Sequence, residues 1–224
     1  MTEVRRVRFG TIVRPAEETA DGWARVEALD GYLVPLPGAR LLLFDTGIAA
    51  GDPEVDAHYR PERIPLREAL AAAGARPEDV ALVANCHLHL DHAGGNPALP
   101  DRPLYVQRAE LDAAREPGHT VPHLVDHPGA RYEVLEEETE VAPGVRLLPT
   151  PGHTPGHQSL LVDTAEGGLL LAGQTHDTAS AWTADAEAAR RPDENLPPPP
   201  DWFPALLDRV HEVRLAHDAA IWRA

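Results

Sequence analysis

The sequence contains no lysine, because all 20 of its basic residues are arginine. A chain without lysine has no amine for Schiff-base catalysis and no phosphate-binding loop that depends on lysine. Serine is nearly absent as well: Ser159 and Ser180 are the only two, and neither lies in a Gly-x-Ser-x-Gly turn. The composition therefore favours a reaction that needs no nucleophile from the protein.

Cys86 is the only cysteine, so the chain can form neither an internal disulfide bond nor a zinc site of four thiolates. No apolar run reaches the 18 or more residues that a membrane helix needs. The first six residues are not followed by the apolar run of a secretory signal, and we therefore expect a cytoplasmic protein.

The net charge of −16 limits the partners that the chain can bind. Nucleic acids and anionic membranes are recognised through basic surfaces, so we expect neither as a partner. A small neutral or cationic substrate is easier to admit than a polyanion. The sequence leaves the oligomeric state open, with a homodimer as one possibility.

The length of 224 residues suits one domain with a sizeable core. No low-complexity run divides the chain before a proline-rich stretch, residues 191–200, which predicts an extended, solvated loop. We therefore expect residues 1–224 to form a single domain.

Short apolar runs and helical periodicity alternate along the chain. The runs predict strands at residues 31–34, 40–44, 80–84, 104–106, 145–148, 159–162, 168–172 and 213–216. The periodicity predicts helices at residues 65–73, 109–115 and 202–211. Strands in both halves with helices between them predict an α/β (α+β) fold of two packed sheets covered by helices.

The sequence His87-Leu88-His89-Leu90-Asp91-His92 directly follows the strand predicted at 80–84. Imidazole and carboxylate groups are the ligands that zinc prefers when thiolates are lacking. His87 and His89 can bind one ion while Asp91 and His92 turn toward a second. Gly94 and Gly95 then allow a tight turn and the close approach of a helix. The block predicts a metal site on a loop at the end of a strand.

A second block, Thr150 to Leu160, follows the strand predicted at 145–148. It contains two Pro-Gly pairs, and His153 lies at the tip of the turn that they define. We expect His153 to be a ligand. His157 begins the next strand, and we expect it to orient the loop, as residues behind the ligands commonly do.

Other residues are assigned a structural or peripheral place. Asp45 to Gly47 forms a polar turn near the site, and Cys86 is expected in the core. His119, His123 and His127 lie in a loop segment and are either solvated or part of a substrate cleft. Trp182 and Trp202 belong either to the core or to an apolar pocket wall.

The two histidine blocks, together with Ala216-His217-Asp218, resemble the metallo-β-lactamase superfamily, and most closely its N-acyl homoserine lactonases. The similarity extends over residues 31–218 and includes Leu66 to Leu70, Arg76 to Val80 and Gly156 to Leu160. It implies a four-layer αβ/βα sandwich of two mixed sheets flanked by helices. It also implies that His87, His89 and His153 bind one divalent ion, and that Asp91, His92 and His217 bind a second.

Gln174 is where the sequence departs from this family, in which an aspartate at that position bridges the two metals. A glutamine offers one neutral oxygen and is a poorer ligand. Gln174 therefore coordinates weakly, or His176 or Asp177 replaces it, or one ion binds loosely. The tyrosine that the lactonases carry shortly afterwards is also absent, and Asp177 stands near its place.

We therefore predict a metallo-hydrolase that uses a metal-activated water on a small neutral lactone or related ester. Zinc is the expected cofactor, as one or two ions, with Mn, Fe or Co as alternatives. Asp91 is the predicted catalytic residue, which orients the water or carries a proton to the leaving group. The alternatives are a thioester or other ester hydrolase of the same superfamily, or a degenerate metal-binding protein weakened by Gln174.

Overall fold

The computed structural model describes residues 3–19, 21–191 and 197–224. The first half of the chain forms β1 (Arg5–Arg14), β2 (Arg25–Leu36), β3 (Arg40–Phe44), α1 (Pro53–Tyr59), β4 (Glu62–Arg63), α2 (Leu66–Ala72), β5 (Val80–Ala84), β6 (Pro103–Gln107), α3 (Arg108–Ala113), α4 (Pro122–Val125) and β7 (Arg131–Leu135). The second half forms β8 (Thr139–Ala142), β9 (Val145–Pro149), β10 (Gln158–Thr164), β11 (Gly167–Gly173), α5 (Ala179–Arg190), α6 (Phe203–Leu207), β12 (Val210–Leu215) and β13 (Ile221–Arg223).

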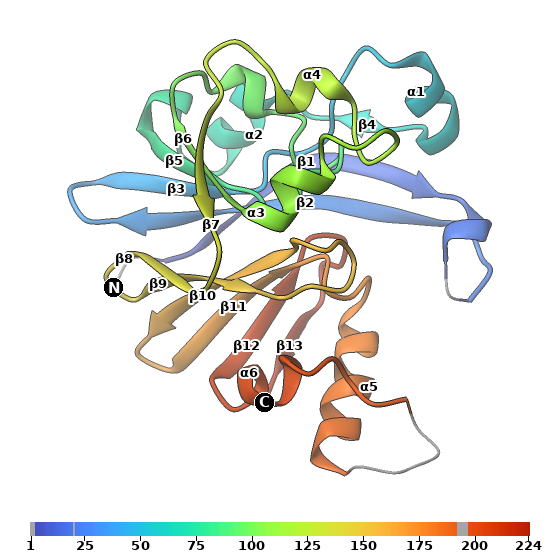
Figure 1. Cartoon of the computed structure of the whole chain (residues 1–224), viewed down its shortest axis with the longest axis vertical. Helices are drawn as coiled ribbons and strands as arrows, with labels where there is room; N and C mark the ends of the chain where they lie inside the picture. The colour runs from blue at the N-terminus through green and yellow to red at the C-terminus, as the bar shows by residue number, and fades with distance from the viewer. Residues whose placement is uncertain (1–2, 20, 192–196) are drawn as a thin grey trace.

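The strands form two mixed sheets that face each other, as predicted. One sheet has seven strands in the order β4-β1-β2-β3-β5-β6-β7, and the other has six in the order β13-β12-β11-β10-β9-β8. Helices α1 to α4 cover the outer side of the first sheet, and α5 and α6 lie on the outer side of the second (Figure 1). The result is the predicted four-layer sandwich.

Four apolar clusters hold these layers together, and the smallest of them packs α3 and α4 beside Val106 of β6. Between the sheets, Tyr32, Phe44, Leu147 and Leu171 belong to one buried cluster. A second cluster lies between the first sheet and α2, and a third joins the second sheet to α5 and α6. Removing such apolar surface from water stabilises the fold by about 25 cal/mol per Å². Packing on both faces explains why the central strands are continuous apolar runs.

The eight predicted strands coincide with β2, β3, β5, β6 and β9 to β12. Five strands had no counterpart among the predictions, namely β1, β4, β7, β8 and β13. Among the missed strands, β1 is long and alternates: Val7, Phe9 and Ile12 are buried, and arginines flank them. Three α-helices, α1, α4 and α5, were not predicted either. The longest of them, α5, buries Trp182 and Ala186, and its remaining positions are largely small or polar, so its periodicity is weak.

The helix predicted at residues 202–211 was too long. The structure ends α6 at Leu207, and Val210 already pairs with Gly168 of the neighbouring strand β11. Pairing with a buried strand outweighs the helical preference of this segment. The sequence predicts no strand after residues 213–216, whereas β13 follows β12 in the structure and pairs antiparallel with it.

The loop predicted at residues 191–200 lies partly outside the described residues, because residues 192–196 are not among them. Residues 197–200 belong to neither helix nor strand, in agreement with the prediction.

Candidate metal centre

The histidine block lies on the loop that follows β5, as predicted, and its backbone is held at several points. Asp45 accepts a hydrogen bond from the Cys86 N–H at 2.8 Å, and Asn85 donates to the His92 carbonyl at 2.9 Å. Gly94 passes so close to the loop after β3 that a Cβ atom there would lie 2.0 Å from the Ala49 nitrogen. The close neighbour of Gly94 is therefore a loop, whereas the sequence predicted a helix.

His87, His89 and His153 converge from the loops after β5 and β9, and their ring nitrogens lie within 4.8 Å of one another. His153 Nε2 is 3.2 Å from His89 Nδ1. The His87 ring is completely buried, and its Nε2 atom has no hydrogen-bond partner among the described residues. A buried nitrogen without a partner is costly, and a divalent cation would satisfy it. The donor set therefore fits a metal ion.

Asp91, His92 and His217 form the adjacent group. His92 Nε2 and His217 Nε2 are 3.1 Å apart, and Asp91 Oδ2 lies 3.5 Å from each of them. His217 follows β12 and is buried, and its Nδ1 donates to the Ala28 carbonyl at 2.9 Å. That hydrogen bond directs Nε2 toward the other ligands, as partners behind metal-binding histidines commonly do.

Gln174 lies between the two groups. Its Oε1 atom is 3.2 Å from His92 Nε2, and its Nε2 donates to Asp177 at 3.5 Å. Gly173 has a φ of +59°, and a Cβ atom there would lie 2.4 Å from that of Cys86, so only glycine permits this turn. The amide oxygen consequently faces the histidines.

His176 and Asp177 were the other two residues that the sequence left open as replacements. His176 packs on Trp182 and Phe203, and its Nε2 lies 3.2 Å from Asp185. Asp177 forms an ion pair with Arg25 at 3.2 Å. Of the three candidates, Gln174 is the one that reaches the histidines.

His157 has the orienting place that the sequence predicted. Its Nδ1 is 2.9 Å from Thr150 Oγ1, and its Nε2 accepts the Gln174 backbone N–H at 3.1 Å. Cys86, His87 and His157 also bring donor atoms within 4.8 Å. Because both ring nitrogens of His157 are already used, it fixes Gln174 and the loop after β9. Cys86 lies in the core between the sheets, as expected.

Two residues that hold the candidate ligands in place were not recognised in that role from the sequence. Asp45, predicted as part of a structural turn, also places Oδ2 3.1 Å from His92 Nδ1 and so orients that ring. Glu110, in the first turn of α3, is 1% exposed and accepts hydrogen bonds from the Leu88 N–H at 2.8 Å and from Thr154 Oγ1 at 2.5 Å. No sequence signal marked Glu110, because its partners lie on two distant loops.

Burial and neighbouring charges divide the histidines into two kinds. Burial lowers the pKa of His89 to about 4 and that of His153 to about 3, which leaves neutral imidazoles ready to bind a cation. Burial also opposes the charged form of His92, but Asp91 and Asp45 outweigh it and raise the pKa of His92 to about 9. His92 thus has a strong preference for a positive charge, whereas burial lowers the pKa of its neighbour His217.

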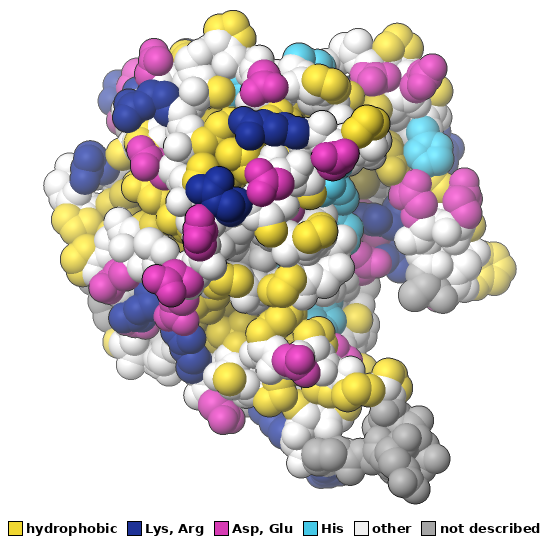
Figure 2. All heavy atoms as spheres, viewed as in Figure 1, with side chains coloured by type: hydrophobic (Ala, Val, Ile, Leu, Met, Phe, Trp, Pro, Cys, Tyr) yellow, Lys and Arg dark blue, Asp and Glu magenta, His cyan; other side chains and the backbone are white. Residues whose placement is uncertain are grey.

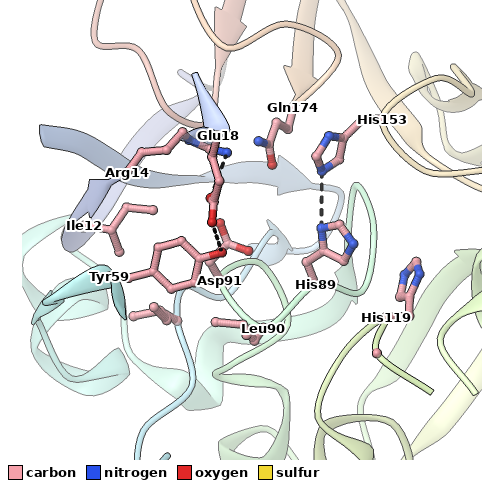
Figure 3. Close-up of a pocket in the computed structure, with 12 residues that line it drawn as sticks. Ile12, Arg14, Glu18, Tyr59, His89, Leu90, Asp91, His119, His153 and Gln174 are labelled. Carbon is pink, nitrogen blue, oxygen red and sulfur yellow. Dashed lines mark hydrogen bonds and ion pairs between the residues drawn. The ribbon is translucent and has the colours of Figure 1, made fainter. Parts of the chain in front are cut away.

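A pocket of about 310 Å³ opens onto these residues, and its lining is shown in Figure 3. It is lined by Ile12, Arg14, Glu18, Ile48, Tyr59, His89, Leu90, Asp91, Gly118, His119, His153 and Gln174. In the space-filling view, histidine side chains are visible in a hollow between the main part of the molecule and the projecting part that contains α1 (Figure 2).

His119 is the one of the three loop histidines that lines this pocket, and it is 2.8 Å from Glu110. His127 is buried elsewhere, and His123 lies exposed on α4. Trp182 is completely buried in the third core cluster, and Trp202 packs at its edge and donates to the Pro151 carbonyl. Neither tryptophan lines the pocket, so the apolar wall considered from the sequence is not formed by them.

Comparison with known proteins identifies the family. The pattern of the metallo-beta-lactamase superfamily matches residues 31–214. The chain belongs to the metallo-beta-lactamase superfamily, the family that the histidine blocks indicated. Within the described residues, no helix is both long and apolar enough to cross a lipid bilayer.

Among its relatives, the chain is 46% identical over 102 residues to an N-acyl homoserine lactonase of Bacillus cereus. That match covers 46% of this chain and 40% of the relative, so it spans less than half the length of the curated lactonases. The fold is similar to that of B. thuringiensis AiiA with N-decanoyl-L-homoserine at the active site, with a TM-score of 0.75 and 24% identity over 96% of this chain and 93% of the other. An N-acyl homoserine lactone hydrolase with N-hexanoyl-L-homoserine at its catalytic metal center gives the same TM-score, identity and coverage.

Proposed function

We propose that the chain is a metal-dependent hydrolase that opens a lactone or related ester, as the N-acyl homoserine lactonases among its relatives are named for doing. The convergence of His87, His89 and His153 around a buried nitrogen without a partner carries this proposal. Asp91, His92 and His217, with the amide oxygen of Gln174, provide the second ligand group. We infer zinc as the ion, because its preferred donors are those present.

A divalent ion held by these ligands would supply a water whose pKa is lowered to about 7 and would polarise the carbonyl of the ester. The remaining tasks belong to side chains of this chain. Among the described residues, the lining of the pocket contains no serine, cysteine or lysine, so none of these three kinds of nucleophile faces the substrate. Direct attack by water is the reaction that this lining supports.

Asp91 is suited to orient the water that attacks the ester. Burial by itself would raise the pKa of Asp91, but His92 and His217 outweigh it and hold that pKa below its ordinary value. The carboxylate is therefore ionised at neutral pH and lines the pocket, where it can accept a hydrogen bond from the attacking water and orient it; the water is the source of the proton that the leaving alkoxide takes up.

We also infer that residues 1–224 act as a single domain. The ligands come from both halves of the chain, and one core cluster joins Phe44 of the first sheet to Leu171 of the second. A half without its partner would expose this cluster and lose part of the site.

The test is metal analysis of the purified protein together with a substrate panel of N-acyl homoserine lactones, simple lactones, a thioester and a phosphodiester. We expect ring opening of lactones, its loss after treatment with a chelator, and its return with added zinc. Preference for the thioester would favour a thioesterase, and a metal-loaded protein that hydrolyses nothing would contradict the proposal.

A further inference from the structure

The pocket wall opposite the histidines carries charged side chains. Arg14, at the end of β1, lies beside Glu18, and Tyr59 from the end of α1 lies next to both (Figure 3). Ile12, Ile48 and Leu90 form the apolar part of the lining. A purely apolar wall would suit an aliphatic chain, whereas this one offers polar groups within the same pocket as Asp91.

Arg14 has donors that nothing in the described structure uses. Its Nε donates to the buried Glu27 at 2.7 Å, and its side chain is 12% exposed. The nearest other carboxylate oxygen, on Glu18, lies 4.0 Å from Arg14 NH1, which is too far for a hydrogen bond. Tyr59 and His58 occupy the other oxygen of Glu18, at 3.2 and 2.7 Å. The terminal N–H groups of Arg14 thus remain available on the pocket wall.

Arg25 shows that neutralising Glu27 does not account for Arg14. Arg25 Nε donates to the other oxygen of Glu27, also at 2.7 Å, and its terminal nitrogen pairs with Asp177. Both arginines therefore bind the same carboxylate, but only Arg14 lines the pocket. The pair provides a matched comparison between a structural role and a role in binding substrate.

We propose that Arg14 determines substrate specificity by donating hydrogen bonds to a second carbonyl-type oxygen of the substrate, away from the ester that is cleaved. This inference rests on the proposed lactone or ester hydrolysis. A guanidinium presents its donors in a planar fork that matches carbonyl and carboxylate oxygens. The nearby Glu18 and the net charge of −16 favour a neutral oxygen, such as that of an amide, over a carboxylate.

The experiment compares Arg14→Met with Arg25→Met on two lactones with side chains of equal length. One is an N-acyl homoserine lactone, and the other is a γ-alkyl lactone without a second carbonyl. A hydrogen bond to a charged donor contributes roughly 10- to 100-fold in binding. We expect Arg14→Met to reduce the ratio of the two kcat/KM values by about that factor, through KM. Arg25→Met should leave the ratio at its wild-type value.

A binding measurement provides a readout that does not depend on turnover. Calorimetry with the ring-opened acyl homoserine should show weaker binding to Arg14→Met than to Arg25→Met. Arg14→Lys keeps the positive charge next to Glu27 and so protects folding, and it should reduce the ratio less than Arg14→Met. A γ-lactone that carries a carboxylate tests the anionic alternative, and preference for it over the amide would overturn the choice of a neutral oxygen.

The outcomes separate the two levels of the argument. If the wild type opens lactones but the ratio is unchanged in both Arg14 variants, or falls equally in Arg25→Met, the assignment of Arg14 is overturned and the hydrolase proposal stands. If the wild type opens no lactone or ester, the hydrolase proposal fails, and the role of Arg14 fails with it.

Discussion

The His89 ring lies beside those of His87 and His153, with centroid distances of 4.4 and 5.0 Å, and its removal tests the first ligand group directly. Because structural and catalytic zinc sites need at least three protein ligands, we expect His89→Ala to lose about one equivalent of metal and nearly all hydrolysis. Metal content by elemental analysis and a lactone assay measure both. His58→Ala is the control, because His58 is exposed and is not a candidate ligand. Full metal content in His89→Ala would show that His89 is not a ligand.

Gln174 offers a neutral oxygen at the point between the two ligand groups. A carboxylate there would offset the repulsion between two dications, so we expect the second ion to be lost more easily than the first. Changes behind the ligands shift metal affinity by about 10- to 100-fold, and Gln174→Asp, which acts on a ligand, should tighten the second site by at least that factor. The control is Gln107→Asn, because Gln107 is also buried but its amide donates to Gln158 and contacts none of the candidate ligands.

A competitive chelator titration of the wild type and Gln174→Asp measures this difference. Two ions held equally tightly by both proteins would show that the neutral amide does not limit the second site. His176 and Asp177 are then weak substitutes, because their side chains already bind Asp185 and Arg25.

At the scale of elements, α3 joins the two ligand loops through one carboxylate. Glu110 accepts hydrogen bonds from Leu88, between His87 and His89, and from Thr154, next to His153. The spacing of His89 and His153 therefore depends on a helix that contributes no ligand. Gly156 crosses the start of α3 so closely that a Cβ atom would lie 1.9 Å from the Glu110 nitrogen.

Glu110→Gln should therefore weaken metal binding without removing a ligand. Its amide cannot accept as many hydrogen bonds as the carboxylate, and an unsatisfied buried donor costs about 1–3 kcal/mol. We expect metal affinity to fall about 10-fold, measured by chelator competition, together with a lower free energy of unfolding. Asp112→Asn, exposed on the same helix, is the matched control. Equal metal affinity in Glu110→Gln and wild type would contradict this positioning role.

At the scale of the whole molecule, the candidate site lies where the two sheets meet. His217 follows β12, and the neighbouring Leu215 carbonyl accepts a hydrogen bond of 2.9 Å from Tyr32 of β2 in the other sheet. A metal ion bound across this junction would stabilise the sandwich as a unit. A ligand whose free concentration is 100 times its dissociation constant adds about 2.7 kcal/mol to the free energy of unfolding.

The stabilisation by zinc should grow with pH between about 6.5 and 9. In the metal-free protein the pKa of His92 is raised to about 9 from an ordinary 6.5, so its protonated form stabilises the fold fully below pH 6.5. That contribution is lost as pH rises through 9, and a cation that replaces the proton restores it. Thermal unfolding with zinc and with chelator should show a difference in Tm that widens over this range.

Magnesium, which prefers oxygen ligands, is the control ion and should produce little of this effect. A Tm difference with zinc that stays constant from pH 6.5 to 9 would show that His92 does not exchange a proton for the metal.

The two-sheet sandwich and the loops that carry most of the candidate ligands could be predicted from the sequence. His87 to His92 and His153 were predicted because each lies in a contiguous block after an apolar strand, and both signals are local. The strand β1 was not predicted although its residues alternate, and the position of Arg14 at the end of that strand was therefore not predicted either. The length of α6 was misjudged because Val210 joins a strand whose partner lies elsewhere in the chain.

The side chains that line the pocket could not be predicted from the sequence, because they are brought together only when the chain folds. Arg14, Tyr59 and His119 come from separate parts of the chain, and so does Glu110, which binds His119. No spacing in the sequence links these residues to the histidine blocks. The tertiary structure also decided that Gln174, rather than His176, faces His92, because the positive φ of Gly173 turns the chain after β11. The candidate ligands lie in short contiguous segments and can be recognised locally, whereas the shape and charge of a pocket depend on which surfaces the packed sheets bring together.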